Sequence, residues 1–433
     1  MNLAMVTRAI RRYVLIQDRP AYEELLQHLD THQDVWKVPQ GEVAAWWERR
    51  QTASLDLSIV QGGTLRISCP LGDSVVEIDG HDLRIPPFEC SVSLDMPRGA
   101  VSVTYGYTGI HSDFVNEMLG HLGYGHLTPA PPGQHADIAE EHWTTVLETL
   151  RCSAVDNKRY EREGIDALRS LISEAHHRRG IPDLRLWSLP HRSGRPYRAA
   201  VSTRYDVDKA IVNLPAIHEL EAKYGLRSTA YLRPMGLFYG PSEIRRYRKV
   251  SGENEAALHG EFVSTAERRF GDELTAARKE KEFLEEVICA EVRGVCMHGG
   301  ELRTNTTSRT QSAIEAAGFK YETMYRNDYY FPLHLPTDQG VRKTLSIGQH
   351  FADVTVEPGP AFPMILARTF IDRFSQAAAE GGIFVPVMHP LYFGLARYLR
   401  HPINLLRLAA FVPKFVVTAS RTKRGEQYSN RPE

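Results

Sequence analysis

The 433-residue chain lacks several features that would define its class directly. It has no apolar run of about 18 residues, the length that a membrane-spanning helix needs. Its N-terminus has neither the apolar core nor the small-residue cleavage site of a secretory signal. Lys and Arg number 52 against 53 Asp and Glu, so no charge excess indicates nucleic-acid binding or an acidic disordered tail. We therefore expect a cytoplasmic protein that binds no nucleic acid and has no transmembrane segment.

Cysteine is also scarce, and the familiar nucleotide and nucleophile motifs are missing. The five cysteines are widely spaced; no Cys-x-x-Cys pair exists, which disfavours a structural zinc site and favours free thiols in a reducing compartment. There is no Gly-x-x-x-x-Gly-Lys loop, no Gly-x-Gly-x-x-Gly turn after a strand and no Gly-x-Ser-x-Gly elbow. The sequence thus gives no support to the common nucleotide-binding and serine-hydrolase classes.

Apolar residues make up 42% of the chain, which suits a soluble protein of two or three domains of about 150 residues. Helical spacing predicts that residues 1–50 are helical, and period-two alternation predicts a small antiparallel, β-sandwich-like domain at 51–112. A helical connector at 113–195 follows. Residues 196–412 alternate short apolar strands with helices, which is typical of an α/β domain. A basic tail occupies 413–433.

Four predicted strands of the α/β region end in residues that can bind a metal. The runs read AAVSTRYDVD, NEAALHG, RGVCMHG and IFVPVMHP. The carboxyl ends of parallel strands converge on one face of a sheet or barrel, where active sites lie. Residues two apart on a strand also share a face. We therefore expect five side chains to meet: Asp206, Asp208, His259, His298 and His389.

These residue types suit hydrolysis without a protein nucleophile. A carboxylate and imidazoles hold a divalent metal with an open position, and such a metal polarises a carbonyl and lowers the pKa of bound water. A second carboxylate can accept the proton, and an opposing histidine can protonate the leaving atom. Each motif alone also suits a turn, a helix cap or a loop histidine, and His298, followed by two glycines, is the weakest. Their repetition within one domain favours a site.

The same motifs resemble the polysaccharide deacetylase (NodB-homology) superfamily over about residues 180 to 400. Tyr205 to Asp208 (YDVD), Leu258 to Gly260 (LHG), Ala317 to Thr323 (AGFKYET) and Val387 to Pro390 (VMHP) occur in the order of the family's motifs. The resemblance implies a distorted (β/α) barrel of fewer than eight strands, with zinc or a similar divalent ion as cofactor.

Carried over to this sequence, the family's roles fall on four residues. The resemblance makes Asp206 the catalytic base, Asp208 and His259 metal ligands, and His389 the general acid. A second family histidine, four residues after the first, is replaced by Val263. Either His298 or water supplies the third ligand, or the metal site has decayed.

A second departure lies in the strand before His298, where the family's arginine is replaced by Cys296. Branches linked to surface-polysaccharide biosynthesis look similar. The resemblance thus implies a hydrolase of non-peptide C–N bonds that removes an acyl group, N-acetyl foremost, from a sugar of a polysaccharide or a lipid-linked precursor. The alternative is a catalytically degenerate module that binds glycan or a partner in surface-polysaccharide assembly.

The first helical region carries a resemblance of its own. Residues 34–50 (DVWKVPQGEVAAWWERR) resemble the closing segment of deacetylase domains, although they lie near the start of the chain. Two interpretations stay open. Residues 1–50 are either the end of a truncated upstream deacetylase-like unit or an independent helical cap on the β domain. The first predicts that Trp46 and Trp47 pack on the β domain and form no sugar site.

Overall fold

The computed structural model describes most of the chain between residues 18 and 394. The described ranges are 18–51, 56–60, 64–68, 74–78, 81–85, 90–93, 112–124, 138, 145–146, 150, 162–178, 184–187, 189–192, 195–236, 238–298, 308–324, 329–337, 340–356 and 361–394. The basic tail predicted at 413–433 lies outside these ranges. No helix among them is long and apolar enough to cross a lipid bilayer.

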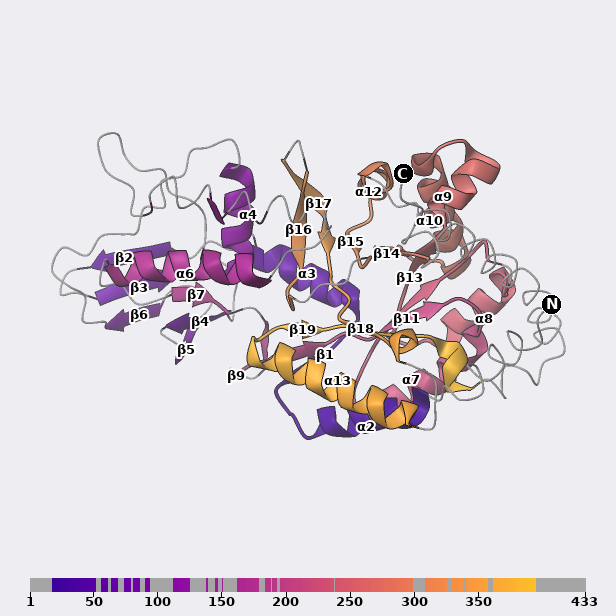
Figure 1. Ribbon diagram of the computed structural model, residues 1–433, viewed down its shortest axis with the longest axis horizontal. Coiled ribbons are helices and arrows are strands. Elements are labelled where there is room, and N and C mark those ends of the chain that lie inside the picture. The colour runs from indigo at the N-terminus through magenta and orange to yellow at the C-terminus, as the bar shows by residue number, and fades with distance from the viewer. Residues whose placement is uncertain are drawn as a thin grey trace, which may run out of the picture.

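A nine-stranded sheet forms the centre of the α/β part (Figure 1). Its strands, in spatial order, are β16 (Leu333–Thr337), β17 (Gly340–Ser346), β15 (Tyr321–Glu322), β14 (Gly294–Met297), β13 (Glu255–Gly260), β12 (Thr229–Leu232), β11 (Arg204–Val207), β20 (Pro386–Met388) and β18 (Phe351–Ala352). All neighbours are parallel except β16 and β17, which form an antiparallel pair.

The sheet confirms the predicted α/β class but corrects the predicted barrel. Eight of its strands are mutually parallel, so the expectation of fewer than eight strands is wrong. Within the described ranges no ladder joins β18 to β16, and the sheet stays open. The two ends explain this, because β16 turns back on β17 as an antiparallel partner and β18 contributes only two residues.

Helices alternate with these strands and cover the sheet. They are α7 (Leu214–Lys223), α8 (Pro241–Val250), α9 (Phe262–Thr265), α10 (Glu273–Ile288), α12 (Ser308–Ala316) and α13 (Phe362–Ala379), with short turns η1 (Ile211–Asn213), η2 (Ala266–Phe270), η3 (Asp353–Thr355) and η4 (Pro390–Phe393). Helix α10 shows how local sequence determines where a helix begins and ends. Asp272 caps its first turn by accepting the Thr275 N–H at 2.8 Å, and the helix ends at Cys289, whose φ of 53° is left-handed.

Strand side chains alternate between an outer face against the helices and an inner face. Tyr205 points outward, where its hydroxyl donates to Glu221 of α7 at 2.9 Å. Its neighbours Arg204 and Asp206 point to the inner face, because successive strand residues face opposite ways. The inner face of the neighbouring strands carries Tyr231, Ala257, Cys296 and Tyr321, which belong to one buried cluster. The candidate site residues extend this inner row toward the carboxyl ends of the strands.

The described part of the first predicted segment, residues 18–51, belongs to the same α/β domain. Helix α2 (Asp18–Asp30) lies along α13 (Figure 1), and the Tyr22 hydroxyl donates to Glu221 at 2.7 Å. Strand β1 (Val35–Lys37) pairs in parallel with β10 (Ala199–Val201), and β10 pairs with β19 (Ile383–Phe384). The segment is therefore not purely helical as predicted. A three-residue strand shows too little alternation to be found in sequence.

Helix α3 (Gln40–Gln51) docks at the amino-terminal ends of the strands. The backbone N–H of Gln40 donates to Thr229 Oγ1 at 2.8 Å, and that of Gly41 donates to Glu255 Oε2 at 2.7 Å. Trp47 is fully buried and packs against Phe331. Trp46 is also buried, with an exposure of 8%. The two tryptophans thus belong to one buried hydrophobic cluster, at the end of the sheet opposite to the candidate site.

The predicted β domain contains two antiparallel sheets. Strands β2 (Asp56–Val60), β3 (Thr64–Ser68) and β6 (Cys90–Ser93) form one sheet, and β4 (Ser74–Ile78), β5 (His81–Ile85) and β7 (Leu184–Leu186) form the other. Strand β7 comes from the predicted connector, which also holds α4 (Ser112–Leu122), α6 (Arg162–Arg178) and the short pair β8 (His191–Arg192) and β9 (Arg195–Pro196). The connector is thus not wholly helical as predicted, because residues 184–186 pair with β4 and adopt a strand conformation.

The docking of α3 predicts that Gly41→Ala lowers stability. An added Cβ would lie 2.3 Å from Glu255 Oε1 and 2.5 Å from Arg293 Nη2, and displacing Glu255 would break its hydrogen bond with the Gly41 N–H. We expect a loss of about 1–3 kcal/mol in the free energy of unfolding, measured by urea titration. Gly120→Ala in α4 is the matched control, because its Cβ would meet no atom closer than 3.4 Å. Equal losses in both variants would contradict this docking.

Candidate active site

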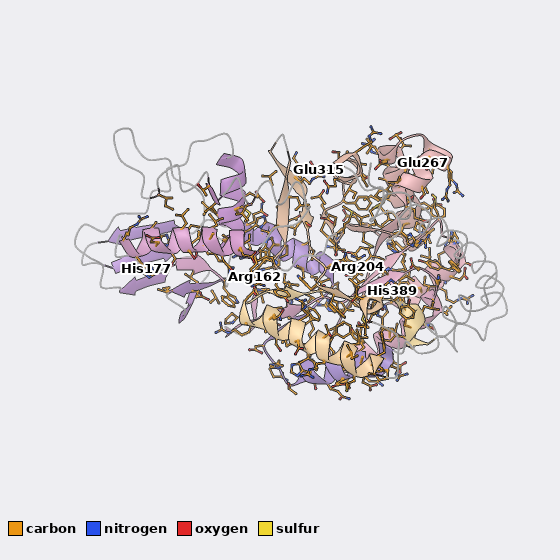
Figure 2. The ribbon with its side chains drawn as sticks, in the orientation of Figure 1. Arg162, His177, Arg204, Glu267, Glu315 and His389 are labelled. Carbon is orange, nitrogen blue, oxygen red and sulfur yellow. The ribbon has the colours of Figure 1, made fainter. Side chains whose placement is uncertain are left out.

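The five side chains that the sequence singled out lie at the carboxyl-terminal ends of their strands. Asp206 belongs to β11 and Asp208 follows it, while His259, His298 and His389 come from β13, the end of β14 and the end of β20. Strands β11 and β20 are direct neighbours, and Arg204 pairs with Val387 across their ladder. Figure 2 accordingly shows Arg204 and His389 in the same region of the α/β part. Among the five, Asp208 is in direct contact with His259 and His298, and His389 is close enough to interact electrostatically with Asp206 and Asp208.

Asp208 lies at the centre of the cluster. Its Oδ1 is 3.3 Å from His259 Nε2, 3.4 Å from His298 Nε2 and 3.3 Å from Arg233 Nη1. Burial opposes ionisation, but the hydrogen bond with His259 and the neighbouring His298 and Arg233 hold the pKa of Asp208 well below its usual value. The side chains of Asp208 and His298 are 26% and 30% exposed. This side of the cluster is therefore accessible to solvent and ligand.

Asp206 lies deeper and is held by an arginine from its own strand. Arg204 donates from Nε to Oδ1 at 2.6 Å and from Nη2 to Oδ2 at 2.8 Å, a bidentate pair. Arg204 also donates to the backbone oxygen of Thr323, and its guanidinium lies over the ring of Tyr231. Burial opposes ionisation of Asp206, but the guanidinium outweighs it and keeps the pKa of the carboxyl below its usual value. The carboxylate is thus anionic and fixed in orientation.

His259 has a partner at each ring nitrogen. Nε2 faces Asp208, and Nδ1 lies 3.0 Å from Cys296 Sγ. Cys296 Sγ in turn lies 3.8 Å from Asp206 Oδ1. His259 and Cys296 are both buried, and burial raises the pKa of the thiol well above its usual value. Cys296 is therefore a protonated thiol between the imidazole and the deeper carboxylate.

Two donor sets around His259 could in principle take a metal ion. The first consists of Asp206, His259 and Cys296, whose donor atoms lie within 4.8 Å of one another. Arg204 already occupies both oxygens of Asp206, the thiol is protonated, and Cys296 has no exposed surface for an open position. A cation there would also face the guanidinium. The first set therefore does not suit a metal.

The second set consists of Asp208, His259 and His298, and unlike the first it is partly exposed, so it leaves an open position for a ligand. Burial lowers the pKa of His298 to about 4, so its imidazole is neutral and retains a lone pair. Asp208 Oδ1 lies 3.3 and 3.4 Å from the two Nε2 atoms, so this carboxylate is within reach of an ion held by either imidazole. Against this, Arg233 contacts the same Oδ1, although the other carboxylate oxygen can be presented to an ion.

His389 is paired with a buried carboxylate. Its Nδ1 lies 2.7 Å from Asp353 Oδ1, and its backbone N–H donates to Asp353 Oδ2 at 2.6 Å. Burial alone would lower the pKa of His389, but the ion pair with Asp353 outweighs it and raises the pKa to about 9. His389 is therefore protonated at neutral pH, and its charge also acts on Asp206 and Asp208.

Sequence reasoning missed three residues of this cluster. Arg204 could have been found, because it lies two residues before Asp206 on the same strand and so shares its face. Arg233 and Asp353 follow β12 and β18 without any motif to mark them. Val263, at the position of the family's second histidine, lies in α9 and supplies no metal-binding atom. The catalytic and metal-binding roles of the predicted residues stay predictions.

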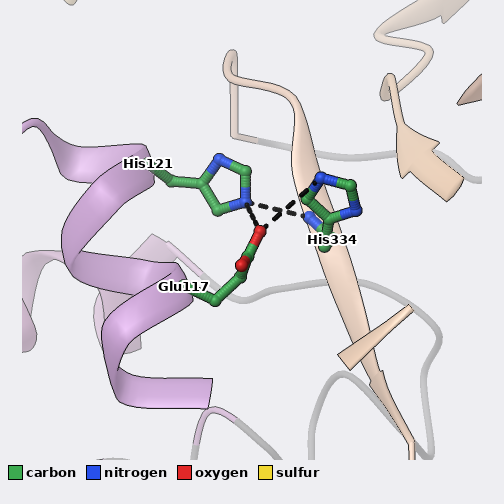
Figure 3. A group of neighbouring side chains, drawn as sticks. All are labelled: Glu117, His121 and His334. Carbon is green, nitrogen blue, oxygen red and sulfur yellow. Dashed lines mark hydrogen bonds and ion pairs between the residues drawn. The ribbon is translucent and has the colours of Figure 1, made fainter. Parts of the chain in front are cut away.

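A second group of metal-type side chains, Glu117, His121 and His334, joins α4 to β16 (Figure 3). Glu117 Oε1 lies 3.0 Å from His121 Nε2 and 3.5 Å from His334 Nε2. The indole N–H of Trp47, which can only donate, bonds His121 Nδ1 at 2.7 Å. The backbone N–H of His334 faces His121 Nε2 at 3.2 Å. Because Nδ1 accepts the indole N–H, the single ring proton of a neutral His121 lies on Nε2 and points to Glu117 Oε1. Neither nitrogen then offers a free lone pair to an ion, so we interpret this group as a hydrogen-bonded junction.

Comparison with known proteins gives only distant similarity. No known protein family and no curated protein matches the sequence. A candidate polysaccharide deacetylase from Mycobacterium smegmatis has a TM-score of 0.36 at 17% identity, over 55% of this chain and 95% of its own. One from Bordetella bronchiseptica, involved in O-antigen biosynthesis, has a TM-score of 0.30 at 14% identity, over 45% of this chain and 72% of its own. A CE4-family pseudoenzyme from Bacillus anthracis has a TM-score of 0.26 at 14% identity, over 44% of this chain and 54% of its own.

These similar structures belong to the family that the sequence motifs resemble. At TM-scores below 0.5, however, such a likeness supports no conclusion about this chain's fold or activity. The function proposed for this chain must therefore rest on its own residues and their geometry.

The pairing of Arg204 with Asp206 predicts strong energetic coupling. Arg204→Met leaves a buried carboxylate without its counter-charge, and we expect a loss of about 3–5 kcal/mol in the free energy of unfolding. Adding Asp206→Asn removes that charge, so the double variant should lose less than the sum of the single variants by about 1–3 kcal/mol. Arg227→Met, which breaks a half-exposed pair with Glu42, should cost under about 1 kcal/mol. If the double variant loses the full sum of the two single losses in unfolding free energy, the coupling between Arg204 and Asp206 is refuted.

Proposed function

We propose that this protein is a metal-dependent hydrolase that removes an acyl group, N-acetyl foremost, from a sugar of a polysaccharide or its precursor. The observation that carries this proposal is that Asp208, His259 and His298 meet at a partly exposed edge beside Asp206 and His389. Two carboxylates in different surroundings and a protonated histidine are what hydrolysis by an activated water requires. The substrate class comes from the motif resemblance, because fold alone does not fix function.

In this mechanism the residues have three roles: they bind the ion, act as the general base, or act as the general acid. Asp208 and His259, with His298 as the third ligand, would hold zinc or a similar ion, which supplies a Lewis acid for the acyl carbonyl. Asp206 accepts the proton of the attacking water while Arg204 fixes its orientation. A carboxylate with so low a pKa is a weak base, so its placement matters more than its basicity.

His389 completes the reaction as the proton donor. Asp353 holds its Nδ1, so Nε2 is the ring nitrogen that can face the leaving atom. Because the ion pair keeps the ring protonated, a proton is present when the acyl bond breaks. Its transfer to the leaving nitrogen releases the sugar amine and the free acid.

A second candidate function is a degenerate module that binds glycan or a partner without hydrolysis. The observation that favours it is Arg233, whose guanidinium contacts Asp208 Oδ1 at 3.3 Å and Glu261 Oε1 at 2.6 Å. It places a positive charge beside the carboxylate that a metal ion would use. The absence of a histidine at Val263 points the same way. In this case Arg233 balances the charge of Asp208 permanently and no ion binds.

Metal content and acetate release distinguish the two functions. We expect about one zinc or similar ion per chain by mass spectrometry, and acetate release from N-acetylated oligosaccharides. Asp208→Asn and His259→Gln should each remove both, whereas His32→Gln, an exposed histidine of the same domain, should change neither. Arg233→Met should raise metal affinity, because it removes a competing cation. Absence of stoichiometric metal after zinc is added back would favour the degenerate module.

The ion pair of His389 predicts an alkaline limb in the pH profile. His389 must be protonated to act as the acid, and Asp353 raises its pKa to about 9 against the burial that lowers it. The value of kcat/KM should therefore persist at neutral pH and fall as pH rises through about 9. Asp353→Asn removes the stabilising charge, so the fall should move to or below the ordinary value of 6.5. An alkaline limb at the same pH in both proteins would exclude His389 as the acid.

A further inference from the structure

Cys296 occupies a central position that the proposed mechanism does not yet use. It is the direct cross-strand partner of His259 in the parallel ladder of β13 and β14, and both side chains lie on the inner face. Its Sγ contacts His259 Nδ1 at 3.0 Å and lies 3.8 Å from Asp206 Oδ1. Strand register, not a flexible rotamer, thus places one thiol between the candidate ligand and the candidate base.

The two nitrogens of an imidazole cannot be set independently. If His259 Nε2 binds a cation, the single proton of the neutral ring must lie on Nδ1, and that N–H needs an acceptor. Cys296 Sγ is in position to accept it. The thiol hydrogen can then point to Asp206 Oδ1. Without a cation the roles reverse, because the thiol donates to Nδ1 and the ring proton on Nε2 points to Asp208.

Other roles of Cys296 fit the structure less well. A direct metal ligand would have to be a thiolate with an accessible site beside it, whereas Cys296 has 0% exposure and the Arg204 guanidinium beside Asp206 would repel a cation there. A nucleophile would have to reach substrate, which a fully buried sulfur does not do. The hydrogen-bonding role requires neither ionisation nor access.

We propose that Cys296 is a positioning residue: it fixes the tautomer and orientation of His259, so that Nε2 faces the ion, and it links His259 to Asp206 through one sulfur. This inference rests on the proposed function, because the ion is the one assigned there to Asp208 and His259. It predicts that zinc affinity depends on a donor and acceptor at position 296, and not only on the three ligands.

The test is the zinc dissociation constant, measured by competition with a chromophoric chelator. Cys296→Val keeps the approximate size but removes the hydrogen bonds, and we expect affinity to fall by about 10–100-fold. Cys296→Ser keeps a group that donates and accepts, so it should stay within several-fold of the wild type. Cys289→Ser, at the exposed cysteine, is the matched control. The free energy of unfolding of each variant, measured without metal, shows whether a variant has lost zinc affinity or has lost its fold.

The outcomes separate this inference from the proposed function. If the wild type binds zinc and Cys296→Val binds it equally well, the positioning role is overturned while the hydrolase stands. If Cys296→Ser is weakened as much as Cys296→Val, the effect is one of packing and the hydrogen-bonding role is likewise overturned. A thiolate-to-cobalt charge-transfer band in the cobalt-substituted wild type would make Cys296 a direct ligand and also overturn it. A wild type that binds no zinc overturns both.

Discussion

The ion pair between Arg204 and Asp206 is the interaction on which the inner face of the sheet depends. A buried carboxylate is tolerated only when a partner offsets its desolvation, and Arg204 does so with two hydrogen bonds from the same strand. Cys296 of β14 lies beside this pair on the inner face, with its Sγ 3.8 Å from Asp206 Oδ1. The contact between Cys296 and His259 follows from their register in the ladder of β13 and β14.

The two ends of the strands serve different purposes. At the amino-terminal ends, α3 closes the core with Trp47, and Glu255 accepts the backbone N–H of Gly41. At the carboxyl-terminal ends polar side chains gather around Asp208. Packing at one end therefore stabilises the sheet so that charged groups can remain partly exposed at the other, the division of labour seen in α/β barrels.

The sequence predicts the parts of this arrangement that follow from simple periodicity. Asp206 and Asp208 share a face because they lie two residues apart on a strand, and His259 and His389 join them because parallel strands end at one edge. Strand β1 and strand β7 could not be found, because three residues carry no measurable period and tertiary pairing selects them. Asp353 and Arg233 were missed for a related reason, since only the folded sheet brings them to His389 and Asp208.

The two departures from the family pattern, at Cys296 and Val263, have different consequences for the site. The arginine missing at Cys296 does not leave the site without a guanidinium, because Arg204 supplies one to Asp206 from their common strand, β11. The histidine missing at Val263 has no such substitute, and Arg233 contacts Asp208 instead. The distinction between a working and a degenerate site therefore depends on one contact. A cation has to compete with Arg233 for Asp208, and this chain offers it the imidazoles of His259 and His298 and the second carboxylate oxygen of Asp208.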